Sequence, residues 1–79
     1  MGFNQELGKR IAGQRRLAGH TQDDVARLLK TTKQTISSYE KGNTRLHADD
    51  LIIICLYLGI SLDDAITEPV MEALEYRKG

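Results

Sequence analysis

The sequence is poor in the residues that staple small proteins together. Among 79 residues there are one cysteine, Cys55, one proline, no tryptophan and two histidines, His20 and His47. A single cysteine excludes an internal disulfide, and the histidines lie too far from each other and from Cys55 for the spacing of a metal site. We therefore expect no metal and no cofactor. A chain of this length forms one small domain, whose core alone gives a narrow margin of stability. We therefore expect the protein to self-associate.

Long apolar runs are also absent. The longest, residues 51–58, is less than half of the roughly 18 residues that a membrane span requires. The first residues, 1–4, do not begin like a signal peptide. We expect a cytoplasmic protein in a reducing compartment that makes no contact with membranes.

The formal net charge is zero, but the charges are divided between two halves. Residues 1–45 carry nine Lys and Arg against four Asp and Glu, which is a net +5. Residues 46–79 carry two basic residues against seven acidic ones, which is a net −5. Such a division is typical of a protein with one nucleic-acid-binding face, although chance placement of solvated charge would give the same sums.

Apolar residues recur with helical spacing and period-two alternation is short, so the sequence predicts an all-α fold. N-cap residues and stop glycines delimit the helices. The predicted helices cover about residues 4–18, 21–29, 32–41, 48–58 and 61–66, and Pro69 begins a last segment that ends near Arg77. In the first of these helices, Leu7, Ile11 and Gln14 are expected to face inward.

Three of the predicted helices begin with the same acidic pair. Their N-caps are Thr21, His47 and Ser61, and the pairs that follow are Asp23-Asp24, Asp49-Asp50 and Asp63-Asp64. The carboxylates complement the helix dipole, whereas adjacent helical residues do not converge as a catalytic acid and base must, so we expect no enzyme. The helix after Thr32 begins with Lys33 and Gln34 instead, which leaves its positive N-terminus available to phosphates and base edges.

Two short helices joined by a tight connection, the second with a polar outer face, have the arrangement of a helix-turn-helix, whose second helix enters the DNA major groove. The residues of the wider pattern are Leu7-Gly8-Lys9-Arg10-Ile11, Arg15, Gly19, Thr21-Gln22, Val25-Ala26, Thr32, Thr35-Ile36-Ser37, Glu40-Lys41-Gly42, Leu51, Ile54 and Leu58-Gly59-Ile60-Ser61-Leu62-Asp63. In order and spacing the chain closely resembles the Cro/phage-repressor (XRE-type) family. The resemblance implies a five-helix lambda-repressor-like domain over residues 1–66 with a C-terminal helical extension over residues 67–79.

The resemblance also implies roles for individual residues in binding double-stranded DNA. The base-reading candidates are Lys33, Gln34, Ser37 and Ser38. Gln pairs well with adenine, and Lys with the acceptors of guanine. The candidates for contacts to the DNA backbone are Gln22, Thr32, Lys41, Asn43, Thr44 and Arg45. Gln22 is further expected to hold the recognition helix, and Arg15 and Glu40 to form a structural ion pair.

Several positions depart from the family pattern. Lys30 stands where the turn usually has glycine, so a left-handed residue there would be strained, or the turn differs. Gln14 and His20 occupy positions that are usually apolar, and Leu46 and His47 replace the common Pro-Ser. For both histidines a packing or capping role is expected.

The helix over residues 48–58 has two apolar stripes. Leu51, Ile54, Cys55 and Leu58 suit the core, with Cys55 as a small buried hydrophobe. The second stripe, Ile53, Leu56, Tyr57 and Ile60, lies on another face and predicts a homodimer interface. The rival interpretation is that the C-terminal segment folds back over this stripe with Val70, Met71, Ala73, Leu74 and Tyr76.

These features predict a sequence-specific transcriptional regulator, most simply a dimeric repressor that reads a palindromic operator in the major groove. The alternative is an antitoxin or other partner-binding protein, whose essential surface is the C-terminal region and whose DNA binding is autoregulatory.

Overall fold

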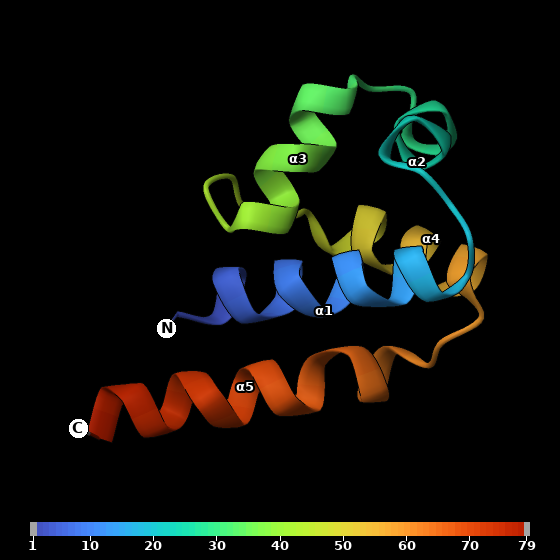
Figure 1. Ribbon diagram of the computed structural model, residues 1–79. Helices are drawn as coiled ribbons and strands as arrows, with labels where there is room; N and C mark the ends of the chain where they lie inside the picture. The colour runs from blue at the N-terminus through green and yellow to red at the C-terminus, as the bar shows by residue number, and fades with distance from the viewer. Residues whose placement is uncertain (1, 79) are drawn as a thin grey trace.

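A computed structural model describes residues 2–78, and the side chains of residues 2–75, as five helices connected by short turns and loops (Figure 1). The helices are α1 (Phe3–Leu17), α2 (Gln22–Leu29), α3 (Lys33–Lys41), α4 (Ala48–Leu58) and α5 (Leu62–Lys78). Residues 2–78 contain no strand, so the predicted all-α fold is confirmed. Within that range, no helix combines the length and the apolar character needed to cross a membrane.

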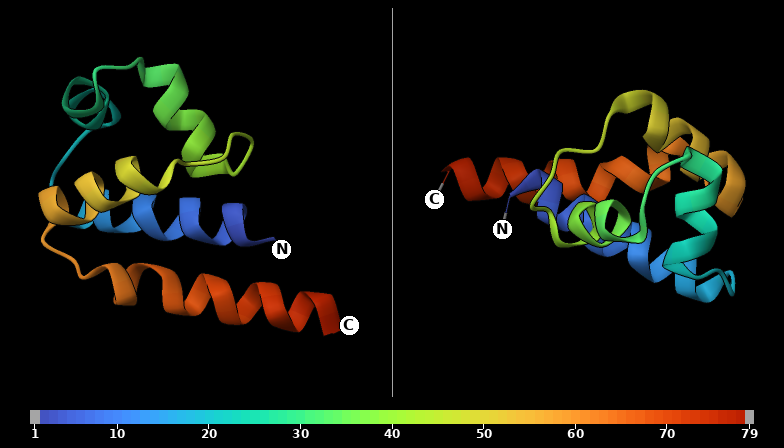
Figure 2. Two further views of the ribbon diagram at one scale, coloured as in Figure 1. Left: turned by 180° about the vertical axis from the view of Figure 1, so that it is seen from behind. Right: turned by 90° about the horizontal axis from the view of Figure 1, so that it is seen from above.

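Helix α1 is the central element of the fold. Helices α2 and α3 lie on one side of it, and α5 runs back along its opposite side, so that both chain ends lie at the same end of the molecule (Figure 1). The view from behind in Figure 2 shows α4 in front of α1, and α4 packs against α2 and α5. As a consequence, α3 and α5 are separated by the body of the domain.

Every helix contributes to one hydrophobic core. Val25 of α2, Ile36 of α3 and Ile54 of α4 are fully buried, and Leu7 and Ile11 of α1 pack with them. Burying side chains of this size stabilises the fold by about 1.5–3 kcal/mol each. The predicted inward positions of Leu7 and Ile11 are therefore confirmed.

The predicted inner stripe of α4 is also confirmed. Leu51, Ile54 and Cys55 are buried and Leu58 packs against the core. Cys55 is a free thiol with 3% of its surface exposed, and burial raises its pKa. It therefore acts as a small hydrophobe, because reaction requires an accessible thiolate.

A glycine allows α1 and α3 to cross closely. A Cβ atom on Gly8 would lie 2.3 Å from the carbonyl oxygen of Tyr39 and 2.6 Å from that of Glu40. No larger residue fits against this backbone without moving one helix away from the other. The position of the C-terminal end of α3 on α1 therefore depends on Gly8.

The predicted N-caps form where the sequence placed them. Thr21 and Asp24 form a capping box, in which Thr21 Oγ1 accepts from the Asp24 N–H at 3.1 Å and Asp24 accepts from the Thr21 N–H at 2.9 Å. Ser61 accepts from the Asp64 N–H at 3.0 Å. His47 holds the N-cap position of α4, but its side chain makes no capping hydrogen bond. One free backbone N–H in the first turn of α2 and one in that of α5 are therefore satisfied by the cap side chains.

The C-terminal part of the chain differs from the prediction. A fifth helix ending at Ile66 and a separate segment beginning at Pro69 were expected, whereas α5 is one helix with Pro69 inside it. A proline within a helix leaves the carbonyl of residue i−4 without its N–H partner, at a cost of about 3 kcal/mol. Pro69 is fully buried, as is Ala65 one turn earlier. Packing of this face offsets the missing hydrogen bond.

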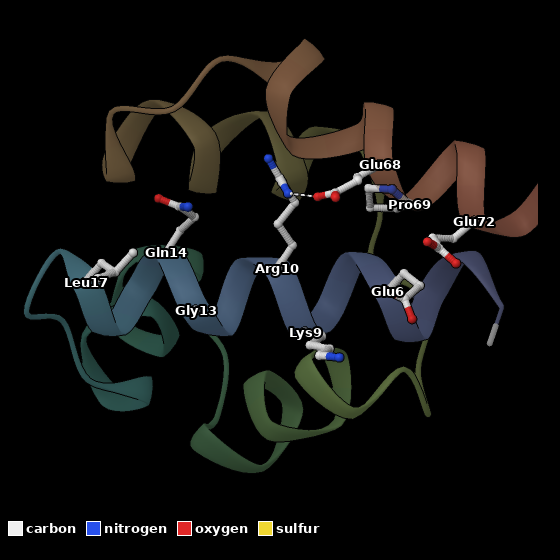
Figure 3. A pocket seen from close by; sticks show the side chains of 9 residues that line it. All are labelled: Glu6, Lys9, Arg10, Gly13, Gln14, Leu17, Glu68, Pro69 and Glu72. Carbon is white, nitrogen blue, oxygen red and sulfur yellow. Dashed lines mark hydrogen bonds and ion pairs between the residues drawn. The ribbon is translucent and has the colours of Figure 1, made fainter.

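Helix α5 packs mainly along α1. It does not cover the second stripe of α4. A groove lies between α1 and α5, where Arg10 of α1 pairs with Glu68 of α5 and Gln14 lies nearer the end of α1, beside Leu17 (Figure 3). Gln14 is half-buried and is not part of the core, so its predicted inward position is wrong. The interpretation in which the C-terminal segment folds over the α4 stripe is wrong for the part of α5 whose side chains are described.

The turn between α2 and α3 places Lys30 in the left-handed conformation, with φ 57° and ψ 44°. Of the two possibilities at this position, the strained left-handed residue is the one that forms. A side chain in this conformation costs roughly 1–2 kcal/mol, which glycine avoids.

Lys30→Gly is expected to raise the free energy of unfolding by about 1 kcal/mol, because relief of this strain exceeds the added freedom of the unfolded chain. Lys30→Ala is the control, since it removes the charge and keeps the Cβ atom. Urea unfolding of the three proteins measures the difference. Equal stability of the Gly and Ala variants would contradict the prediction.

Candidate nucleic-acid interface

Helix α3 is held by its inner face and presents a polar outer face. Ile36 is fully buried and Tyr39 packs against the core. Burial, with the carboxylates of Asp50 and Asp49, raises the pKa of Tyr39, so its phenol stays protonated. On the outer face Lys33 and Gln34 are exposed, while the other two predicted base readers, Ser37 and Ser38, are half-buried.

The N-terminus of α3 differs from those of the other helices. Each of α1, α2, α4 and α5 has at least one carboxylate in its first turn, and α3 has none. Thr32 caps α3 by accepting from the Thr35 N–H at 3.2 Å, and Lys33 adds a positive charge at the first helical position. The positive end of the helix dipole is therefore not neutralised by an acid, which is the condition that suits an anionic ligand.

The residues that follow α3 form an exposed polar loop. Asn43, Thr44 and Arg45 are exposed, as is Lys41, the last residue of α3. The Ser38 hydroxyl and the Thr44 hydroxyl lie 2.5 Å apart in a hydrogen bond, which ties the loop to the helix. Ser38 was predicted to contact a base, and Thr44 was predicted to contact the DNA backbone. The structure brings these two side chains together.

A buried ion pair connects α3 to the rest of the fold. Arg15 Nε donates to Glu40 Oε2 at 2.7 Å and its Nη2 donates to Oε1 at 3.2 Å. Both side chains are less than one-tenth exposed. Gln22 Nε2 donates to Glu40 Oε1 at 2.9 Å. The structural pair and the contact of Gln22 with the recognition helix are confirmed, whereas the phosphate contact of Gln22 stays a prediction.

The sequence did not reveal a contact between His20 and α4. The His20 ring packs on Tyr57 with 4.5 Å between ring centroids, and its Nδ1 lies 3.2 Å from the Tyr57 hydroxyl. Asp24 lies 3.7 Å from the same nitrogen. The hydrogen bond from the Thr21 backbone N–H lowers the pKa of Asp24, and Arg27 and His20 act in the same direction. The departure of His20 from an apolar family position was the available signal, but it did not identify Tyr57 as the partner.

Glu40→Ala is expected to lower the free energy of unfolding by about 3–5 kcal/mol, because it leaves the Arg15 guanidinium buried without its counter-ion. The control is Glu68→Ala, which removes the ion pair with Arg10 at a carboxylate that is 74% exposed. That change should cost less than about 1 kcal/mol. Denaturant unfolding of both variants would refute the assignment of the buried pair if the two losses were equal.

Comparisons with known proteins agree with this geometry. A helix-turn-helix family model matches residues 11–64, which is more than half of the chain. No curated protein sequence matches it. One crystal structure of the clp gene regulator ClgR from Corynebacterium glutamicum superposes with a TM-score of 0.80 at 22% identity, covering 91% of this chain and 94% of that chain.

A second crystal structure of ClgR from the same organism has a TM-score of 0.83 at 20% identity and covers 99% of this chain and 83% of that chain. At these identities the likeness establishes the fold alone. The family match, together with α2 and α3 in the positions of the motif, establishes the membership. The chain belongs to the helix-turn-helix family of the Cro/phage-repressor (XRE) type, a family of DNA-binding regulators.

Proposed function

We propose that the protein is a dimeric transcriptional repressor that reads a palindromic operator with α3 in the major groove. The observation that carries the proposal is the N-terminus of α3, which is exposed, free of carboxylates and anchored from behind by the buried pair of Arg15 and Glu40. A rigid helix with exposed polar side chains at its N-terminal end is the element that reads base edges in this motif.

The two exposed residues at the start of α3, Lys33 and Gln34, are the principal base readers in this proposal. Ser37 lies one turn further on, and Ser38 shares its hydroxyl with Thr44. The backbone contacts come from both sides of α3, through Gln22 and Thr32 before it and Lys41, Asn43, Thr44 and Arg45 after it. Contacts at both ends would set the register of the helix in the groove.

The proposed dimer uses the second stripe of α4. Ile53, Leu56 and Tyr57 are 40%, 78% and 39% exposed. Ile60 is half-buried and packs against the core, so it contributes the edge of the interface. A two-fold interface on α4 would present two copies of α3 to half-sites about one DNA turn apart.

A second candidate function has an observation in its favour on α5. Val70, Met71 and Leu74 are exposed on this helix, and the side chain of Tyr76 lies outside the described residues. A protein partner on this surface would make the chain an antitoxin or a similar partner-binding protein with autoregulatory DNA binding. In either case we divide the chain into a DNA-binding domain, residues 1–66, and an extension, residues 67–79, although α5 runs through the boundary.

Gln34→Ala is expected to weaken operator binding by about 1–3 kcal/mol and to relax the preference at one base pair, because it removes a base-edge contact. The operator is first obtained by selecting bound duplexes from a random pool. Arg45→Ala is the comparison, since loss of a phosphate contact weakens all sequences alike and lowers the salt dependence. Unchanged affinity and preference in Gln34→Ala would contradict the placement of α3 in the groove.

Leu56→Asp is expected to make the protein monomeric and to lower operator affinity, because it places a charge in the proposed interface. Leu17→Asp is a matched control, since Leu17 is 82% exposed at the end of α1 and is not a residue of the stripe. Light scattering at micromolar concentration reports the mass of each protein. A monomeric wild-type chain would rule out the dimer.

A further inference from the structure

An apolar groove lies between the start of α1, the loop before α4, the first turns of α4 and the start of α5. Its volume is about 480 Å³, within the range of small-molecule sites. Ile52 and Leu62 are 46% and 39% exposed, and Phe3, Leu46 and Ile66 are half-buried. The apolar floor is therefore reached from solvent.

The groove has a single formally charged lining residue, Arg45. All of its lining residues are apolar except Arg45 and His47, and no carboxylate lines it. Arg45 has no ion pair within the described part of the chain. This composition contrasts with the neighbouring helices, because α4 and α5 each begin with two Asp residues. An apolar floor with a cationic rim is complementary to a molecule with an apolar body and an anionic end.

We propose that this groove binds an amphipathic acid, with an unbranched acyl chain on Ile52, Leu62 and Ile66 and its carboxylate on Arg45. Charge complementarity selects this occupant over an uncharged one, because a carboxylate meets the guanidinium without an acid opposing it. A consequence for DNA binding rests on the proposed function. Arg45 would then be shared between the ligand carboxylate and a DNA phosphate, so ligand binding would weaken DNA binding.

The first experiment measures binding of sodium decanoate to the full chain below its micelle concentration, by calorimetry and by the rise in Tm. Octanoate, which is shorter by two methylene groups, is expected to bind about tenfold more weakly. Decanol has the same chain without the carboxylate and is also expected to bind more weakly. Absence of decanoate binding, or equal affinity for decanol, overturns the proposal.

The second experiment locates the site with two similar variants. Ile52→Asp places a carboxylate on the groove wall and should abolish decanoate binding. Met71→Asp makes the same change at a residue that is 54% exposed on α5 and does not line the groove, so it should bind decanoate as the wild type does. Decanoate binding that survives Ile52→Asp overturns the proposal. So does a wild-type dimer that ignores decanoate but is dissociated by Ile52→Asp, since the groove would then belong to a subunit interface.

The third experiment tests the link to DNA. Decanoate is expected to lower the affinity of the wild type and of Met71→Asp for duplex DNA by the same factor for every sequence, while Ile52→Asp is unaffected. Decanoate binding without any change in DNA affinity overturns the link through Arg45 and leaves the acid site standing. A chain that binds decanoate but no duplex from a random pool instead refutes the proposed DNA-binding function.

Discussion

The arrangement of this small domain depends on one buried ion pair. Arg15 of α1 donates two hydrogen bonds to Glu40 near the end of α3, and Gln22 of α2 donates a third to the same carboxylate. Arg15 also donates to the carbonyl oxygen of His20 at 2.8 Å. These partners offset the desolvation of two charges, which would otherwise destabilise the core. One cluster thereby fixes α1, α2 and α3 relative to one another, and Gly8 allows the close approach that it requires.

This anchoring leaves the outer face of α3 free for recognition. Ile36 and Glu40 hold the helix from within, so Lys33 and Gln34 are exposed without a structural task among the described residues. The position of the acidic side chains of α5 also favours recognition by this face of α3. Helix α5, which carries five acids, lies across α1 from α3 (Figures 1 and 2), so these five acids are kept away from the face assigned to DNA. A net charge of zero is therefore compatible with a polyanionic partner.

The remaining exposed apolar surface results from the small size of the domain and its core. A domain of this length cannot bury every large side chain of α4 and α5, because it has too few helices to cover every face of each. Leu56 and Ile52 are both left exposed, one turn apart on the same side of α4. The first suits a second subunit, and the second opens onto a groove whose rim includes Arg45. Both surfaces lie next to elements that position the recognition helix.

The sequence by itself determined what depends on local energetics. Helix type, the caps at Thr21, Thr32 and Ser61, and the inner stripe of α4 follow from spacing and from hydrogen bonds within a few residues. The pair of Arg15 and Glu40 was predictable only through the family resemblance. Tertiary structure alone decided that α5 continues through Pro69, that Lys30 adopts a left-handed turn and that His20 packs on Tyr57. In each case packing between helices outweighs a local preference, and residues distant in the sequence supply that packing energy.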